Sequence, residues 1–275
     1  MNKYLKYSFK SLLILFLVVY CLFPFIWMII VSLVREPDFL MIGKNTGFSF
    51  ANYQAVLSSS SLSFFSYLKN SLFISFISAV IATFCSSLSA YAFTRFEFRG
   101  KIFLAVLVLA LSMFPQISIM GFLFKMMTGL RLINTYPGLV FPYTALALPL
   151  AFWIMLTYFK KIPLDLDKSA LIDGASRFQV LTKIIIPVAL PGIISTLILT
   201  FIFSFNEFLF ALILTIDTKA RTIPVAIALF EGLHGQIPWG QIMAASVLAI
   251  LPVFVLVGFM QRYVIQGLTY GALKE

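Results

Sequence analysis

The sequence contains few charged residues, one histidine and two cysteines. Only 11% of its 275 residues are charged, whereas soluble domains average about 25%. No Ser/His/Asp or Cys/His set converges around the single histidine, and no G-x-x-x-x-G-K-[ST] phosphate loop is present. We therefore expect that the chain is not an enzyme and holds no catalytic residue, metal or cofactor of its own.

The cysteines, the histidine and the net charge point to no further site. Cys21 and Cys85 lie inside apolar runs without CxxC spacing, which is typical of small hydrophobic side chains. His234 lies in a polar loop, where a solvent-exposed role is expected. The formal charge of +10 comes from basic residues between long apolar runs rather than on one face. This pattern favours a membrane and predicts no nucleic-acid partner.

Apolar residues make up 61% of the chain and are concentrated in long runs. A helix needs about 20 mainly apolar residues to cross a bilayer. Six stretches qualify, namely Ser11–Val34, Ser71–Phe93, Ile102–Phe124, Pro137–Phe159, Val188–Leu214 and Ile242–Ile265. The first is too long for the apolar region of a cleaved signal peptide. The sequence predicts an all-α, multi-pass membrane protein with six transmembrane helices in a single domain, residues 1–275.

The distribution of Lys and Arg predicts the orientation. Of these 20 residues, 13 lie on the side of the N-terminus and 7 on the other side. Cytoplasmic loops carry the excess of basic residues. We therefore expect both termini and the loop at residues 160–187 to be cytoplasmic. Two longer segments, Arg35–Asn70 and Thr215–Gln241, are expected outside as loops with short helical pieces.

The most polar segment lies between the fourth and fifth predicted spans. Pro163 suits the first turn of a helix, and Asp165 and Asp167 then lie near the positive N-terminal end of that helix. Gly174 is a plausible C-terminal stop. Ser176 and Gln179 have the spacing of a capping box, which predicts a second helix. The expected form is helix, tight turn, helix, with Pro187 at the entry to span five.

The first of these two helices carries small residues at a spacing that predicts a docking surface. Ala170 and Gly174 are four residues apart, with Ser169 beside them, so a partner could approach the backbone closely. Phe178 and Leu181 on the second helix would add an apolar anchor. The alternative is a helical hairpin that lies on the membrane surface.

The same segment resembles the signature of ABC-importer permeases, Glu-Ala-Ala, three residues, Gly, nine residues, Ile, any residue, Leu, Pro. Here it reads Lys168-Ser169-Ala170, then Gly174, Ile184, Ile186 and Pro187, with every gap correct. Lys168, Ser169 and Ile186 depart from the pattern. The resemblance implies a coupling helix that sits in a cleft of an ATPase subunit. The coupling residues it implies are Asp167, Lys168, Ser169, Ala170, Asp173, Gly174, Phe178 and Pro187.

The resemblance extends over nearly the whole chain. The segments that carry it are NSLFISF near Asn70, AYAFTRFEFRGK at 90–101, MFPQ at 113–116, NTYPGLVFPY at 134–143, FSFNEFLFAL at 203–212, and the C-terminal QRYVIQGLTYGALKE. They are similar to the second permease of importers for maltose, trehalose and related oligosaccharides, and glycerol-phosphate importers share them. The resemblance implies the type I importer permease fold in a bacterial inner membrane, and uptake of a sugar. The implied partners are a sister permease, two ATPase subunits that bind ATP and Mg, an extracytoplasmic substrate-binding protein, the sugar and membrane lipid.

Polar residues inside the apolar runs are candidates for lining a translocation path. These are Gln116, Ser118, Asn206 and Glu207. A charge at the bilayer midplane costs about 2.5–3.5 kcal/mol, so Glu207 should contact protein or water. Because one carboxylate could bind a proton, an ion-coupled secondary carrier is the alternative function; a purely structural scaffold is disfavoured by the coupling motif. Prolines that could kink helices around the path are Pro24, Pro115, Pro142, Pro149, Pro191 and Pro252.

Overall fold

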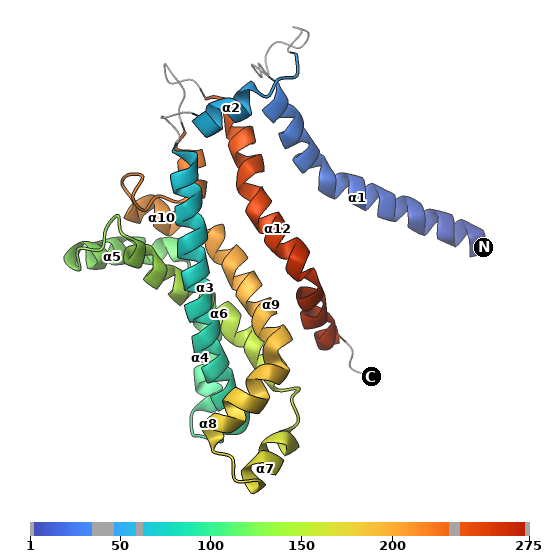
Figure 1. Cartoon of the computed structure of the whole chain (residues 1–275), viewed down its shortest axis with the longest axis vertical. Helices are drawn as coiled ribbons and strands as arrows, with labels where there is room; N and C mark the ends of the chain where they lie inside the picture. Colours follow the sequence, from blue (N-terminus) through green and yellow to red (C-terminus); the bar gives the residue numbers. More distant parts are fainter. Residues whose placement is uncertain (1–2, 35–46, 59–62, 231–236, 273–275) are drawn as a thin grey trace. The chain divides into compact units, whose positions relative to one another are not determined.

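The computed structural model describes residues 3–34, 47–58, 63–230 and 237–272, and no strand runs through these residues beyond an isolated bridge between Val34 and Phe48 (Figure 1). Predicted positions in the gaps, including His234, lie outside the described residues. The helices are α1 (Lys3–Leu33), α2 (Ala51–Ser58), α3 (Phe64–Arg95), α4 (Lys101–Ser112), α5 (Gln116–Gly129), α6 (Tyr136–Phe159), α7 (Leu164–Ile172), α8 (Arg177–Val180), the π-helical turn η1 (Leu181–Ile185), α9 (Ile186–Phe205), α10 (Leu209–Leu214), α11 (Ile223–Ala228) and α12 (Trp239–Ala272).

The long apolar helices of the structure agree with the prediction of an all-α, multi-pass membrane protein. Among the described residues, five helical segments are long and apolar enough to cross a membrane, and the bent pair α4 and α5 would make a sixth. The five segments are Phe9–Leu33, Phe64–Arg95, Tyr136–Phe159, Arg177–Phe205 and Trp239–Met260.

The contacts divide the chain into two compact units. Unit 1 is Met1–Phe65 with Ala226–Leu251, and unit 2 is Ser66–Val225 with Pro252–Glu275.

Unit 1 is organised around Asn52 on α2. Its Nδ2 donates to the backbone oxygens of Ser32, at 2.9 Å, and Val34, at 2.7 Å. These carbonyls lie at the C-terminal end of α1, where no intrahelical donor remains for them. Gly240, at the start of α12, approaches so closely that a Cβ there would lie 2.5 Å from Asn52 Nδ2. The end of α1, α2 and the start of α12 therefore pack as one group.

Unit 2 is built on α3, α6 and α9. The two latter helices pack closely at Gly192, where a Cβ would lie 2.4 Å from Cγ of Tyr158. A buried apolar cluster joins these helices to the loop between α6 and α9. Its members are Ala90, Tyr91, Phe152, Met155, Leu156, Phe159, Ile162, Ala170, Val180, Leu181, Ile185 and Ala189.

The other end of α3 holds the loop between α10 and α11. Asn70 Nδ2 donates to the backbone oxygens of Thr218 and Arg221, each at 3.0 Å. Asn134 Nδ2 donates to Asp217 Oδ1 at 2.8 Å, and this hydrogen bond lowers the pKa of Asp217. Asn70 and Arg95 are separated along α3 by roughly 38 Å at 1.5 Å per residue. The α10–α11 loop and the α6–α9 loop thus lie at opposite ends of unit 2.

The third predicted span, Ile102–Phe124, is wrong as a continuous helix. α4 ends at Ser112, α5 begins at Gln116, and the two axes differ by 91°. Pro115 precedes α5 in an extended conformation, with φ −63° and ψ 120°. Proline has no N–H to donate and disfavours a helical conformation in the residue before it, so it ends the first helix here.

The fifth predicted span, Val188–Leu214, is also interrupted. α9 ends at Phe205, and a new helix, α10, starts at Leu209. The carboxylate of Glu207 accepts hydrogen bonds from the backbone N–H groups of Phe210, at 2.8 Å, and Ala211, at 3.2 Å. An acidic side chain that satisfies the free N–H groups of a first turn starts a helix, which explains the break.

Candidate functional site

The loop between α6 and α9 begins with the short helix α7. Pro163 directly precedes Leu164, the first residue of α7, with φ −56° and ψ 135°. Asp165 and Asp167 both lie in its first turn, where the helix dipole favours negative charge. The predicted helix is therefore confirmed, with Pro163 one position before it rather than inside it.

Gly174 ends α7 with a left-handed residue. Its φ is +83°, a conformation that side chains with a Cβ rarely adopt. The N–H of Ala175 donates to the oxygen of Ala170 at 3.0 Å, and the N–H of Gly174 donates to that of Leu171 at 3.2 Å. This pair of bonds is the Schellman arrangement. The prediction that Gly174 is the C-terminal stop is confirmed.

Ser176 begins the second helix through the predicted capping box. Ser176 Oγ accepts from the N–H of Gln179 at 3.2 Å, and Gln179 Oε1 accepts from the N–H of Ser176 at 2.8 Å. The resulting helix α8 continues through η1 into α9, and Pro187 is the second residue of α9. The guanidinium of Arg177 lies over the ring of Phe96, 5.0 Å from its centroid. The helix–turn–helix prediction is confirmed.

The buried and exposed sides of this loop differ from the predicted docking face. Ala170 is buried in the apolar cluster of unit 2 and so faces its own chain. Gly174 lies beyond the end of α7, so it does not form a continuous face of small residues with Ala170 along the helix. Leu181 is buried as well, whereas Phe178 is 74% exposed. The small-residue face centred on Ala170 and the paired anchor with Leu181 are corrected, because the cluster already covers both side chains.

The exposed surface of α7 and of the turn after it is mixed, because Leu164, Leu166 and Leu171 are exposed on α7 along with its polar side chains. Ile172 is 85% exposed, and Ser169 and Asp173 are exposed beside it. Lys168 Nζ donates to Asp165 Oδ1 at 3.2 Å on the exposed surface. An ion pair of this kind contributes about 0–1 kcal/mol, so Lys168 remains free to reorient toward a partner.

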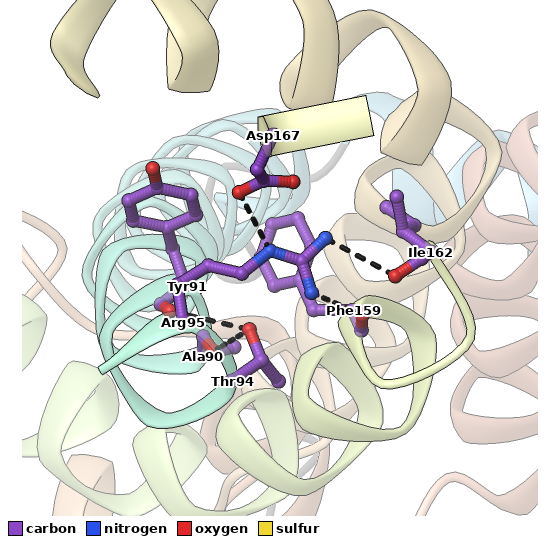
Figure 2. Close-up of polar contacts among 7 residues, drawn as sticks. All are labelled: Ala90, Tyr91, Thr94, Arg95, Phe159, Ile162 and Asp167. Atoms are coloured by element: carbon purple, nitrogen blue, oxygen red, sulfur yellow. Dashed lines mark hydrogen bonds and ion pairs between the residues drawn. The ribbon is translucent and has the colours of Figure 1, made fainter. Parts of the chain in front are cut away.

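Asp167 points inward and pairs with Arg95 at the C-terminal end of α3. Arg95 Nε donates to Asp167 Oδ2 at 2.9 Å, and the side chains are only 3% and 11% exposed (Figure 2). The same guanidinium donates to the backbone oxygens of Phe159, at 3.5 Å, and Ile162, at 3.2 Å. Both carbonyls lie where α6 ends. One side chain therefore contacts α6, α7 and the end of α3.

The predicted path residues lie at the two helix breaks. Gln116 is the first residue of α5 and is half-buried. Ser118 is the third residue of the same helix and is exposed. Asn206 is exposed, and its amide donates to the backbone oxygen of Ile202 at 2.8 Å. Glu207 is buried and binds the first turn of α10, while Tyr143 Oη donates to its backbone oxygen at 3.4 Å. Asn206 and Glu207 therefore have separate partners in this chain.

Within the described ranges, no group of three or more His, Cys, Asp and Glu residues could hold a metal ion.

Comparison with known proteins decides the family. The family described as the binding-protein-dependent transport system inner membrane component matches residues 82–270. The chain belongs to this family. It is an ABC transporter permease, an inner-membrane component with several apolar helices.

Relatives and solved structures agree with this assignment. The permease is 51% identical to a trehalose/maltose transport system permease protein of Thermococcus litoralis. The alignment spans 258 residues and covers 92% of each chain. It is 40% identical over 258 residues to a trehalose transport system permease protein of Mycobacterium tuberculosis, covering 93% of each. A chain of a bacterial ABC transporter involved in alginate import matches with a TM-score of 0.78 at 19% identity, covering 96% of this chain and 98% of that one. The last similarity establishes the type I importer permease fold.

Sequence reasoning missed one residue of this permease that the structure brings to the site. Arg95 lies 72 positions before Asp167 and just beyond an apolar run, where a basic residue reads as an orientation signal. A basic residue at the end of α3 and an acidic residue in the first turn of α7 have opposite charges and can pair once the chain folds. Only the packing of α3 against α6 brings them together.

Proposed function

We propose that this permease forms, with a sister permease, the transmembrane path of an importer for a di- or oligosaccharide such as trehalose or maltose. The single observation that carries the sugar is the 51% identity, over 92% of both chains, to a trehalose/maltose permease of Thermococcus litoralis. ATP hydrolysis would take place in two separate ATPase subunits. An extracytoplasmic binding protein would deliver the sugar.

The α6–α9 loop is the proposed contact with the ATPase subunits. Ile172 and Phe178 expose apolar surface at a turn whose backbone is fixed by the Schellman motif and the capping box. Isolated exposed apolar residues need no explanation, but two large ones on a rigid turn suit insertion into a partner's cleft. Asp167, Lys168, Ser169, Ala170, Asp173, Gly174, Phe178 and Pro187 stay the proposed coupling residues, with Asp167 and Ala170 acting from inside.

The proposed orientation places this loop and both termini in the cytoplasm. It is supported by the excess of basic residues on that side and by the position of the α10–α11 loop at the other end of α3. Gln116, Ser118, Asn206 and Glu207 remain proposed path residues, because each lies at a break in a span where side chains and backbone can face a water-filled cavity.

The test is uptake by the complete complex in proteoliposomes. The permease would be purified with its sister subunit, ATPase subunits and binding protein, with ATP enclosed on the ATPase side. Labelled trehalose, maltose, an alginate oligosaccharide and glycerol phosphate would be compared. We expect trehalose or maltose to accumulate and the other two to remain outside. Accumulation of glycerol phosphate alone would refute the sugar assignment.

A further inference from the structure

Two buried side chains attach helix α7 to the rest of unit 2, and only one of them is charged. Of the side chains on α7, only Asp167 and Ala170 are buried. Ala170 contributes one methyl group to the apolar cluster. Asp167 bonds to Arg95, and the other carboxylate oxygen, Oδ1, is buried with no hydrogen-bond partner among the described residues. The position of α7 therefore depends strongly on one side chain of α3.

Arg95, the last residue of α3, contacts both α7 and the end of α6 because its guanidinium group is planar. Nε binds Asp167 on α7, and the two terminal nitrogens bind the carbonyls of Phe159 and Ile162 where α6 ends (Figure 2). Guanidinium donors are arranged in a rigid fork, and a cation is favoured at the C-terminal end of a helix. The fork thus fixes α7 relative to the ends of both α3 and α6. Lysine, with one flexible ammonium, could not hold the same three acceptors.

A gain in folding stability does not explain why a buried ion pair of this kind is present. Replacing such a pair by apolar residues of similar volume is often neutral or stabilising, because both charges must lose their water. Buried pairs are better explained where they fix one geometry among several. The pair lies next to an apolar cluster that could accept such a replacement, so a role in geometry is the more economical account.

We propose that Arg95 is a positioning residue for energy coupling: its bonds to Asp167 and to the α6 carbonyls make α3 and α6 follow any displacement of α7. The inference rests on the proposed function, in which α7 docks on an ATPase subunit. When the ATPase subunits move α7, the guanidinium transmits that movement to the C-terminal ends of α3 and α6. Without it, α7 moves against the bundle, and ATP is hydrolysed with less transport.

The test measures sugar molecules transported per ATP hydrolysed by the complete complex in proteoliposomes. Arg95→Lys keeps the charge but removes the fork, and Asp167→Asn keeps the shape but removes the charge. Mutations in a coupling route alter coupling by a factor on the order of 2 to 30. We expect both variants to retain the ATPase subunits and to lower the ratio within that range. Glu97→Gln is the matched control, because it breaks the exposed Lys101–Glu97 pair, 3.0 Å long, just beyond α3, and should leave the ratio unchanged.

A charge reversal separates the fork from simple attraction. The double variant Arg95→Asp with Asp167→Arg restores opposite charges, but an aspartate cannot donate to the carbonyls of Phe159 and Ile162. We expect the ratio to stay low. A restored ratio would overturn the bridge between α6 and α7, and a wild-type ratio in both single variants would overturn the positioning role altogether.

Two further outcomes also decide the matter. Loss of ATPase subunits, or of inserted permease, in both single variants would assign the pair to docking or folding and overturn the inference. Failure of the wild-type complex to hydrolyse ATP and transport sugar would instead refute the proposed function, and the inference with it. The wild-type measurement and the variant measurements therefore report on separate claims.

Discussion

Gly174 offers the most direct test of the proposed docking of the α6–α9 loop on an ATPase subunit. Its φ of +83° ends α7, and a Cβ built there meets no atom within 4 Å. Any cost of Gly174→Ala is therefore backbone strain and not a clash inside the chain. A residue with a Cβ pays about 1–2 kcal/mol in the left-handed region. Since 1.4 kcal/mol is a factor of ten, the population of the native turn relative to alternatives should fall about 5- to 30-fold.

Asn and Asp separate this strain from an effect on docking. Both tolerate the left-handed conformation better than Ala does, and they have nearly the same size. Gly174→Asn should therefore retain most of the turn. Gly174→Asp adds a charge at the exposed turn, where we expect it to block close approach of the ATPase subunit and uncouple transport while the chain stays inserted.

The assay combines retention of ATPase subunits by the purified complex with sugar uptake. We expect the order wild type, then Gly174→Asn, then Gly174→Ala, with Gly174→Asp lowest in uptake. Wild-type retention together with wild-type uptake in Gly174→Asp would refute the docking of this turn. Equal losses in the Asn and Asp variants would show that side-chain size, and not charge, is the cause.

Three further predictions concern orientation, packing and the buried carboxylate. In a cysteine-free background, cysteines at the exposed Ser176 and Thr218 should label from opposite sides with an impermeant thiol reagent, and labelling of both from outside would refute the orientation. Gly192→Ala should lower the thermal stability of the purified complex, because overpacking against Tyr158 costs about 1–3 kcal/mol, and an unchanged midpoint would contradict the close contact of α6 and α9. Glu207→Gln can still accept one of the two α10 N–H bonds, so it should cost about 1–3 kcal/mol in stability yet leave ATP-driven uptake largely intact. Loss of uptake in a stably inserted Glu207→Gln protein would favour a titrating role.

Local chemistry made part of the α6–α9 loop predictable from the sequence. Gly174 and the pair Ser176 and Gln179 act through bonds to backbone groups no more than five residues away, and the structure confirms both. Such caps depend on residue type and spacing alone. The helical class followed from long apolar runs in the same way, because lipid requires backbone groups to be satisfied within each helix.

Features set by packing could not be read from the sequence. Spacing placed Ala170 on a free face, but the cluster formed by α3, α6 and α9 covers it. Apolar composition joined residues on either side of Pro115 and Glu207 into single spans, because hydropathy carries no information on where a backbone changes direction. In the sequence, Arg95 indicates only a basic residue at the end of a span, since its partner Asp167 is distant in the chain.

ATP-driven uptake in the absence of an ion gradient tests the central claim most directly. Sealed vesicles with the complete complex and ample enclosed ATP would be assayed for accumulation of labelled trehalose or maltose, with and without a proton uncoupler. An ABC importer permease should accumulate sugar equally in both conditions and stop when the ATPase subunits are inactivated. If the uncoupler abolishes uptake while ATP remains plentiful, and Glu207→Gln does the same, the chain works as a proton-coupled carrier and the account is wrong.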